Sequence, residues 1–300
     1  MTLASVAARA GAEPPPTAAE PTAAPPTTPP ARVNPWAGMT VPSQGVTSPI
    51  GEYSAGCLKG AVKLPMDGPG FQVMHPSRLR YFGTPDLVKF IEHLGSQLHE
   101  QHVGDVMVGD LSQPRGGPAP GGHSSHQTGL DVDLWFWQPK AAEHGPLPKA
   151  DRESIKSRSV LDGKSGVRPE LVSRVSTLLQ LTAEDPHVER VFVSPLIKRQ
   201  LCESTSGERA WLGKIRPWYG HDDHFHVRLA CPADATDCIH QTAVPSGDGC
   251  KELAWWFSAE AQEDRKKGQA TYQAKVGKAP GMPVQCLKLL EPDQRADAKH

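Results

Sequence analysis

The chain has 300 residues, a formal net charge of −1 and a hydrophobic content of 38%. This length can bury a sizeable core, as one large domain or two small ones. The near-neutral charge excludes global attraction to nucleic acid, and no stretch approaches the roughly 20 apolar residues of a membrane span.

The first residues have an unusual composition. Residues 1–12 are rich in alanine and resemble the small-residue end of a signal peptide, although the apolar and basic regions of such a peptide are missing. Residues 13–35 are rich in proline, alanine and threonine, which favours an extended and disordered leader. We predict a folded domain over residues 36–291 and a polar tail over residues 292–300.

The first clear helix begins after Thr84, a good N-cap, with Pro85 at its first position. A strand over residues 103–108 and a loop rich in glycine and proline over residues 114–122 follow. The apolar residues that define one face of the helix are Leu87, Val88, Ile91, Leu94 and Leu98.

A second helix is predicted from about Pro169 to just before Pro186, where apolar residues recur at helical spacing. Residues 188–193 form the next predicted strand and residues 196–202 a short helix. From Cys231 the chain is loop-rich, with one helix expected around residues 255–257.

Two further segments alternate between polar and apolar residues, as strands with one buried face do. In residues 130–136, alternation places Asp131, Asp133 and Trp135 on one face. In residues 224–228, it places His224, His226 and Arg228 on one face. We therefore predict an α+β fold in which a small antiparallel sheet carries a functional site, flanked by helices and long loops.

The two alternating segments adjoin clusters of histidine, one over residues 123–133 and one over residues 218–228. Two imidazoles and one carboxylate suit zinc and leave a position open for water. Gly129 lets the chain bend so that His126 and Asp133 reach the same ion. A lone His-x-His motif is weak, but two clusters with carboxylates together indicate a zinc hydrolase.

Other polar residues of the clusters have predicted supporting roles. His224 is the expected general base, because imidazole titrates near working pH. His123 and His221 are expected in the second sphere or facing substrate. Aspartates that can orient the ligand imidazoles are Asp131, Asp222 and Asp223.

The chain has six cysteines, none of them in a Cys-x-x-Cys pair. An even number without metal spacing indicates disulfides and an oxidising compartment, against the alternative of buried thiols in a cytosolic enzyme. The residues alone leave their pairing open. A nucleophilic mechanism fits poorly, because Ser124 and Ser125 lack the surrounding Gly-x-Ser-x-Gly turn.

The clusters resemble those of the penicillin-insensitive murein endopeptidases, within the superfamily of lysostaphin-type peptidases, D-Ala-D-Ala peptidases and hedgehog proteins. His126 and Asp133 match the His-x6-Asp motif of that superfamily, and His224 and His226 match its His-x-His motif. The blocks over residues 123–133 and 218–228 are similar to this endopeptidase family in particular.

The resemblance implies zinc on His126, Asp133 and His226, with His224, His221 and His123 as catalytic histidines. It implies hydrolysis of D-alanyl–meso-diaminopimelyl cross-links in peptidoglycan, insensitive to β-lactams, by a periplasmic enzyme. It also implies the disulfides Cys57–Cys286, Cys202–Cys250 and Cys231–Cys238.

Two alternative functions stay open. The same scaffold can act as a D,D-carboxypeptidase or dipeptidase, or as a non-catalytic protein that binds zinc and the cell wall. Several aromatic and basic residues near the clusters suit a cleft for a peptide with carboxylates, although a purely structural role is equally common for such residues. They are Trp211, Arg216, Trp218, Tyr219 and Arg228.

Overall fold

The computed structural model of the protein describes residues 34–120, 124–163, 165–275 and 281–291. The predicted signal remnant, the tail over residues 292–300 and all but the last two residues of the leader lie outside these ranges. The predicted catalytic residue His123 lies outside them as well. The domain boundaries therefore stay a prediction.

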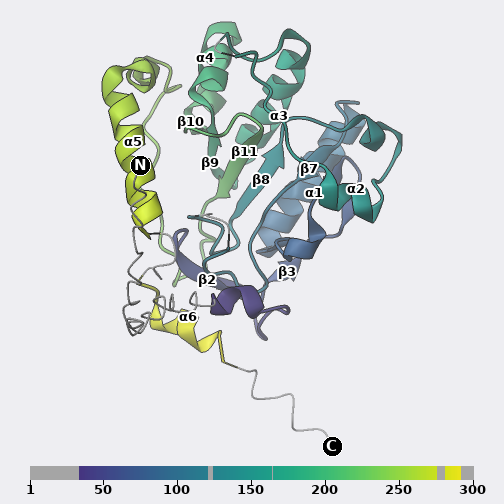
Figure 1. Cartoon of the computed structure of the whole chain (residues 1–300), viewed down its shortest axis with the longest axis vertical. Coiled ribbons are helices and arrows are strands. Elements are labelled where there is room, and N and C mark those ends of the chain that lie inside the picture. Colours follow the sequence, from purple (N-terminus) through teal and green to yellow (C-terminus); the bar gives the residue numbers. More distant parts are fainter. Residues whose placement is uncertain (1–33, 121–123, 164, 276–280, 292–300) are drawn as a thin grey trace, which may run out of the picture. The chain divides into compact units, whose positions relative to one another are not determined.

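A seven-stranded sheet forms the centre of the domain (Figure 1). Its strands are β4 (Asp67–Gly68), β5 (Phe71–Val73), β7 (Val106–Val108), β8 (Asp131–Trp135), β9 (Val188–Val193), β10 (Ile215–Pro217) and β11 (His224–Leu229). They lie in the order β10-β9-β11-β8-β7-β5-β4. The strands predicted over residues 130–136, 188–193 and 224–228 are β8, β9 and β11.

The sheet is mixed. β11 pairs antiparallel with β8 and β9, and β8 pairs antiparallel with β7. The pairs β10–β9 and β5–β7 are parallel. The α+β class is confirmed, but the prediction of an antiparallel sheet is wrong at these two pairs. Each of them is joined by a connection that contains a helix, the kind of crossover that parallel neighbours need.

Six α-helices are present in the described part of the chain. They are α1 (Pro85–Glu100), α2 (Lys149–Ser154), α3 (Val172–Glu184), α4 (Pro195–Ser204), α5 (Ala259–Lys275) and α6 (Val284–Lys288). The predicted helices after Thr84, from about Pro169 and over residues 196–202 are α1, α3 and α4. None of the helices described is both long and apolar enough to cross a membrane.

Short 3-10 helices connect many of these elements. They are η1 (Pro35–Gly38), η2 (Pro76–Arg78), η3 (Lys140–His144), η4 (Pro169–Leu171), η5 (Ala210–Lys214) and η6 (Lys251–Phe257). The helix expected around residues 255–257 is η6, and α5 follows it after a single residue. Neither α5 nor α6 was predicted, since α5 is polar on all sides and α6 is only five residues long.

Two small two-stranded sheets complete the fold, and neither was predicted. β1 (Ser48–Glu52) and β2 (Ala55–Lys59) form an antiparallel hairpin. β3 (Val62–Lys63) pairs with β6 (Phe82–Gly83). The turn of the hairpin lies against the loop that precedes β8.

The ends of α1 explain where the next strand begins. The hydroxyl of Thr84 accepts a hydrogen bond from the backbone N–H of Leu87, as expected of an N-cap. At the other end, the backbone of His102 has a positive φ of 54°, and the N–H of Val103 donates to the carbonyl of Leu98. Residues 101–103 thus close the helix, so β7 begins at Val106 rather than at residue 103.

The main core lies between one face of the sheet and the helices α1, α3 and α4. β8 and β11 contribute to it the apolar half of their alternating patterns, including Val132, Leu134, Phe225 and Val227. Burial of this face is the main favourable term in folding. The opposite face of the same strands is left for the polar residues of the site.

All six cysteines form disulfides. They pair as Cys57–Cys286, Cys202–Cys250 and Cys231–Cys238, the pairs that the family resemblance implied. The first connects β2 with α6, the second connects α4 with the start of η6, and the third closes a short loop after β11. Two of the three disulfides therefore fasten the loop-rich carboxyl-terminal region to the rest of the domain, at β2 and at α4.

Candidate metal centre

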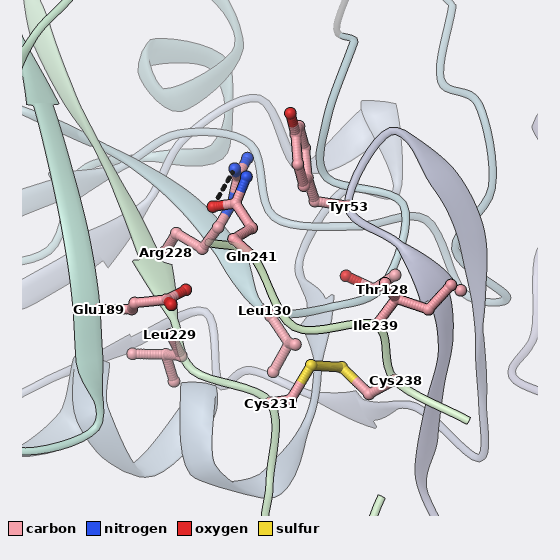
Figure 2. A pocket seen from close by; sticks show the side chains of 11 residues that line it. Tyr53, Thr128, Leu130, Glu189, Arg228, Leu229, Cys231, Cys238, Ile239 and Gln241 are labelled. Carbon is pink, nitrogen blue, oxygen red and sulfur yellow. Dashed lines mark hydrogen bonds between the residues drawn. A yellow bond between two sulfur atoms is a disulfide. The ribbon is translucent and has the colours of Figure 1, made fainter. Parts of the chain in front are cut away.

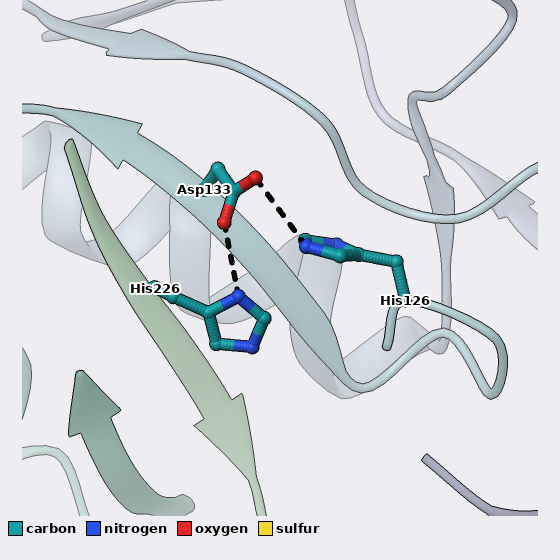
Figure 3. A group of neighbouring side chains, drawn as sticks. All are labelled: His126, Asp133 and His226. Atoms are coloured by element: carbon teal, nitrogen blue, oxygen red, sulfur yellow. Dashed lines mark hydrogen bonds and ion pairs between the residues drawn. The ribbon is translucent and has the colours of Figure 1, made fainter. Parts of the chain in front are cut away.

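His126, Asp133 and His226 come together on the polar face of the sheet (Figure 3). Asp133 lies between the two imidazoles, with its Oδ2 3.3 Å from His126 Nε2 and its Oδ1 3.0 Å from His226 Nδ1. The potential ligand atoms of the three residues all lie within 4.8 Å of one another, and the residues are buried. The spacing matches one shared ion.

Two of the three residues are positioned by strand pairing. Asp133 of β8 and His226 of β11 are direct partners in the antiparallel register, so their side chains leave the same face at the same height. His126 comes from the loop before β8 and has a positive φ of 65°, which is uncommon for a residue with a side chain. Gly129 also has a positive φ, of 73°, and makes the predicted bend.

Gln127 anchors the loop that carries His126. Its Oε1 accepts a hydrogen bond from the N–H of Gly56, and its Nε2 donates to the carbonyl of Ser54. Both partners belong to the region of the β1–β2 hairpin turn. Gln127 is buried, and its anchoring role could not be predicted from local patterns because Gly56 and Ser54 are more than 70 residues away.

His226 is held from its other ring nitrogen by Asp131. Its Nε2–H donates to Asp131 Oδ1 at 2.6 Å, which leaves Nδ1 directed at Asp133. The guanidinium of Arg228 donates to the same Asp131 oxygen, also at 2.6 Å. This contact fits the role predicted for Asp131, because a carboxylate behind a ligand imidazole sets its tautomer and orientation.

The charge of Arg228 keeps Asp131 ionised. Burial alone raises the pKa of the Asp131 carboxyl, but the Arg228 charge and the hydrogen bond from His226 outweigh burial and hold the pKa well below its usual value. The same balance applies to Asp133: burial opposes ionisation, whereas His126 and His224 lower its pKa well below the usual value. Both aspartates therefore present a negative charge to the imidazoles at neutral pH.

Figure 2 shows the surroundings of Arg228 at the far end of β11. Its guanidinium also donates to Gln241 Oε1, and its carbon Cζ lies 3.7 Å from the centre of the Tyr53 ring. The pocket that these residues line adjoins Arg228 and not the metal centre. Arg228 is buried and takes part in this network, so its role here is structural.

His224 lies at the edge of the metal centre. Its Nδ1–H donates to Asp223 Oδ1 at 2.6 Å, and its Nε2 lies 3.8 Å from Asp133 Oδ1. Burial lowers the pKa of His224, but the charge of Asp133 and the hydrogen bond to Asp223 outweigh burial and raise the pKa to about 9. With Nδ1 occupied, Nε2 is the nitrogen that faces the site.

His221 stands next to His224, with 5.0 Å between the ring centres. Its Nδ1–H donates to the carbonyl of Tyr219 at 3.2 Å, which leaves Nε2 as an acceptor. Burial, together with the charges of His224 and His226, lowers the pKa of His221 to about 4. His221 is therefore a neutral imidazole at working pH.

Two of the three predicted orienting aspartates contact an imidazole: Asp131 contacts His226, and Asp223 contacts His224. Asp222 accepts a hydrogen bond from Ser159 instead. Five histidines outside the two clusters are exposed and stand apart from the metal centre: His93, His99, His144, His187 and His240.

The donor set of the centre fits a divalent transition metal. Two imidazole nitrogens and one carboxylate oxygen are the ligands that zinc binds in many hydrolytic sites, with further positions left open. The Asp131–His226 contact supplies the outer carboxylate that such ligands generally have. His126, Asp133 and His226 can thus hold the ion.

Comparison with known proteins identifies the relatives of this chain. The profile of the penicillin-insensitive murein endopeptidases matches residues 49–291. The penicillin-insensitive murein endopeptidase of Klebsiella pneumoniae is 42% identical over 259 residues, which cover 86% of this chain and 91% of that protein. The chain belongs to this family.

Further relatives with the same description come from Salmonella arizonae and Yersinia enterocolitica. The first is 42% identical over 259 residues, covering 86% of this chain and 91% of the relative. The second is 40% identical over 262 residues, covering 86% of this chain and 90% of the relative. The matched region contains the metal centre, both histidine clusters and all six cysteines, so the family membership extends to the candidate site itself.

In this member of the family, the other residues considered for a cleft have different surroundings. Trp211 is buried in the core, and Arg216 forms an ion pair with Glu252 at 3.1 Å. Trp218 is 55% exposed and packs beside Phe192, whose ring lies 5.5 Å from that of His226. Phe192 was not singled out from the sequence, although its place beside His226 in the β9–β11 register puts it on the same face.

Proposed function

We propose that this protein is a zinc-dependent endopeptidase that hydrolyses the D-alanyl–meso-diaminopimelyl cross-links of murein. Family membership supports a peptidase that acts on murein. The observation that carries the metal-dependent part of the proposal is the buried group of His126, Asp133 and His226. Insensitivity to β-lactams follows from a mechanism in which no serine is acylated.

The proposed ligands are His126 through Nε2, His226 through Nδ1 and Asp133 through its carboxylate. When bound, zinc supplies a Lewis acid that polarises the scissile carbonyl and lowers the pKa of a water. The protein contributes the geometry: strand pairing holds Asp133 and His226, and the anchored loop holds His126. The negative charge of Asp131 behind His226 strengthens that imidazole as a ligand.

His224 is the proposed general base. Its Nδ1–H is engaged by Asp223. Once a divalent cation at the centre has lowered the pKa of His224, the free Nε2 can accept the proton of the attacking water and then donate it to the leaving amine. Asp223 holds the imidazole in this tautomer and stabilises its protonated form. The Nε2 of His224 lies 3.8 Å from Asp133 Oδ1 and so faces the proposed metal ligands.

His221 and His123 complete the proposed catalytic set. His221 is neutral and offers Nε2 as a hydrogen-bond acceptor, which suits an N–H of the substrate rather than proton donation. His123 precedes His126 by three residues in the first cluster. Its role rests on the family resemblance.

A periplasmic location is part of the proposal. Three disulfides are stable in an oxidising compartment and rare in the cytosol. Murein, the polymer in the name of the relatives, lies outside the cytosol.

The test is digestion of purified cross-linked muropeptide dimers, followed by chromatography and mass spectrometry. We expect conversion of dimers to monomers that a chelator abolishes, that added zinc restores and that penicillin leaves unchanged. Folded, zinc-loaded protein that leaves dimers intact would overturn the proposal. Release of terminal D-alanine from monomers without cleavage of dimers would indicate the carboxypeptidase alternative.

The variant His224→Ala distinguishes the proposed endopeptidase from a non-catalytic protein that binds zinc and the cell wall. Loss of dimer cleavage with retained zinc supports catalysis by the proposed base. If wild-type protein binds murein and zinc but the variant and the wild type are equally inactive, the protein is a wall-binding module.

A further inference from the structure

A series of neighbouring aromatic rings begins beside the candidate metal centre, each ring tilted or edge-on to the next. The ring of Phe192 lies 5.5 Å from that of His226, and the ring of Trp218 lies 6.0 Å from that of Phe192. Trp256 follows at 6.3 Å from Trp218, and Trp255 at 5.3 Å from Trp256. We refer to Phe192, Trp218, Trp255 and Trp256 as the aromatic platform.

Two of the four large side chains of the platform are exposed. Trp218 is 55% exposed and Trp255 is 40% exposed, whereas Phe192 and Trp256 are partly covered. Exposed apolar patches of this kind on soluble proteins generally mark binding sites. The proposed chemistry uses none of these four residues.

Three contacts hold the platform in place. The disulfide Cys202–Cys250 fastens the start of η6, which carries Trp255 and Trp256, to α4. The ion pair between Arg216 and Glu252 connects η6 to β10. The hydroxyl of Tyr219 donates to the backbone carbonyl of Trp256 at 2.7 Å, which joins η6 to the residues after β10. A surface fixed in this way loses little conformational freedom when it binds a ligand.

We propose that the aromatic platform binds the sugar rings of the murein glycan strand while the attached peptide occupies the metal centre. The face of an indole ring is negative and attracts the weakly positive C–H groups on the face of a sugar ring. This proposal rests on the proposed function, because it takes murein as the substrate. It assigns a second binding site for the glycan part of that substrate.

The spacing fits a substrate in which sugar and peptide are covalently joined. Trp218 is two ring-to-ring steps from His226, of 5.5 and 6.0 Å, a span that about three to four extended residues can cover. A short stem peptide can therefore place its attached sugar on the platform while the cross-link lies at the metal centre.

Charge distinguishes the sugar from the peptide as occupant. A stem peptide carries carboxylates, which favour cationic partners. Two nearby arginines stack on other rings: Arg265 lies 4.7 Å from the ring centre of Tyr219, and Arg199 lies 5.0 Å from that of Phe257. Arg228 lies 5.5 Å from the ring centre of Phe192, but it is buried and paired with Asp131. The rings of the platform itself carry no charge, which suits the sugar.

The test compares two cross-linked dimers that share the same peptide, one bearing its N-acetylated disaccharides and one from which the sugars have been removed. We expect Trp218→Ala and Trp256→Ala in the full chain to raise the KM for the sugar-bearing dimer about five- to tenfold. Their KM and kcat for the sugar-free dimer should stay at the wild-type values, which also reports correct folding. Trp218→Tyr, which keeps an aromatic ring, should raise the KM for the sugar-bearing dimer less than Trp218→Ala does.

Phe257→Ala is the matched control. Phe257 is 40% exposed on the same 3-10 helix but stacks on Arg199. Its removal should therefore leave the KM for both dimers unchanged. An equal rise in KM for both dimers in Trp218→Ala would assign the platform to the peptide and overturn the proposal. Unchanged KM values for both dimers in Trp218→Ala would also overturn it.

A second readout separates this proposal from the proposed function. Isothermal titration with peptide-free N-acetylglucosamine oligosaccharides should show binding to wild type and Phe257→Ala, and loss of binding in Trp218→Ala. Glycan binding without any cleavage of dimers would retain the platform and refute the endopeptidase. Equal cleavage of both dimers without glycan binding would support the endopeptidase and refute glycan binding by the platform.

Discussion

His226 faces Asp133 across the β8–β11 pair, and 3.0 Å separates Nδ1 of the imidazole from Oδ1 of the carboxylate. The same imidazole contacts Asp131 through its other nitrogen, at 2.6 Å. Two carboxylates from one strand thus hold a histidine of the neighbouring strand at both ring nitrogens. Because strands are stiffer than loops, strand pairing fixes this half of the candidate metal centre.

We expect Asp133→Ala and His224→Ala to separate metal binding from turnover. Asp133→Ala should lose both zinc and activity, because it removes a ligand. His224→Ala should keep zinc and lose about 10²- to 10⁴-fold in kcat, the usual contribution of a general base. Zinc content by elemental mass spectrometry, together with dimer cleavage, checks both. Equal loss of zinc in the two variants would mean that His224 is a ligand.

Asp131→Asn should weaken zinc binding about 10- to 100-fold, the usual effect of changing an outer carboxylate. The amide keeps the size of the side chain but removes the charge that orients His226 and compensates Arg228. Competition with a chelator of known affinity measures the change. Asp222→Asn is the control, because Asp222 bonds to Ser159 and not to a ligand. Wild-type affinity in Asp131→Asn would refute the orienting role.

Removal of the metal should reveal a raised pKa for His224. In the metal-free site the carboxylates of Asp133 and Asp223 raise this pKa to about 9 against burial. Since the folded pKa exceeds the ordinary value, the protonated imidazole stabilises the metal-free fold fully below about pH 6.5, and this contribution is lost as pH rises through 9. A bound divalent cation should lower the same pKa.

NMR titration of the imidazole C–H signals, with His224→Gln for assignment, measures this pKa in chelator-treated and zinc-loaded protein. A pKa of His224 near 6.5 in the metal-free protein would contradict the effect assigned to the two carboxylates.

The disulfides should contribute unequally to stability. Cys57–Cys286 joins residues 229 apart, whereas Cys231–Cys238 joins residues 7 apart. On chain entropy alone, losing the first should cost about 5 kcal/mol and losing the second about 2 to 3 kcal/mol. Guanidinium unfolding of the two double Cys→Ser variants compares them. Mass spectrometry of the unreduced protein should detect no free thiol. Equal losses in the two variants would show that chain entropy does not govern the difference.

Much of the site could be predicted from local patterns. Alternation over residues 130–136 and 224–228 was enough to place the aspartates of β8 and the histidines of β11 each on a single polar face. This works because side chains of a strand alternate with a period of two, whatever lies beside the strand. The caps and apolar faces of α1, α3 and α4 are local features of the same kind.

Contacts between residues far apart in the sequence could not be predicted from local patterns. Asp133 and His226 are separated by 93 residues, and only the pairing and register of β8 and β11 make them neighbours. The same register sets Arg228 opposite Asp131, so a side chain suited to a substrate carboxylate is buried in a structural ion pair instead. The parallel outer strands and the aromatic platform depend likewise on how separate elements pack. The local order of residues determines which face of its strand or helix each side chain occupies. Tertiary packing determines which of these faces meet, because the energies of strand pairing and core burial are summed over the whole fold.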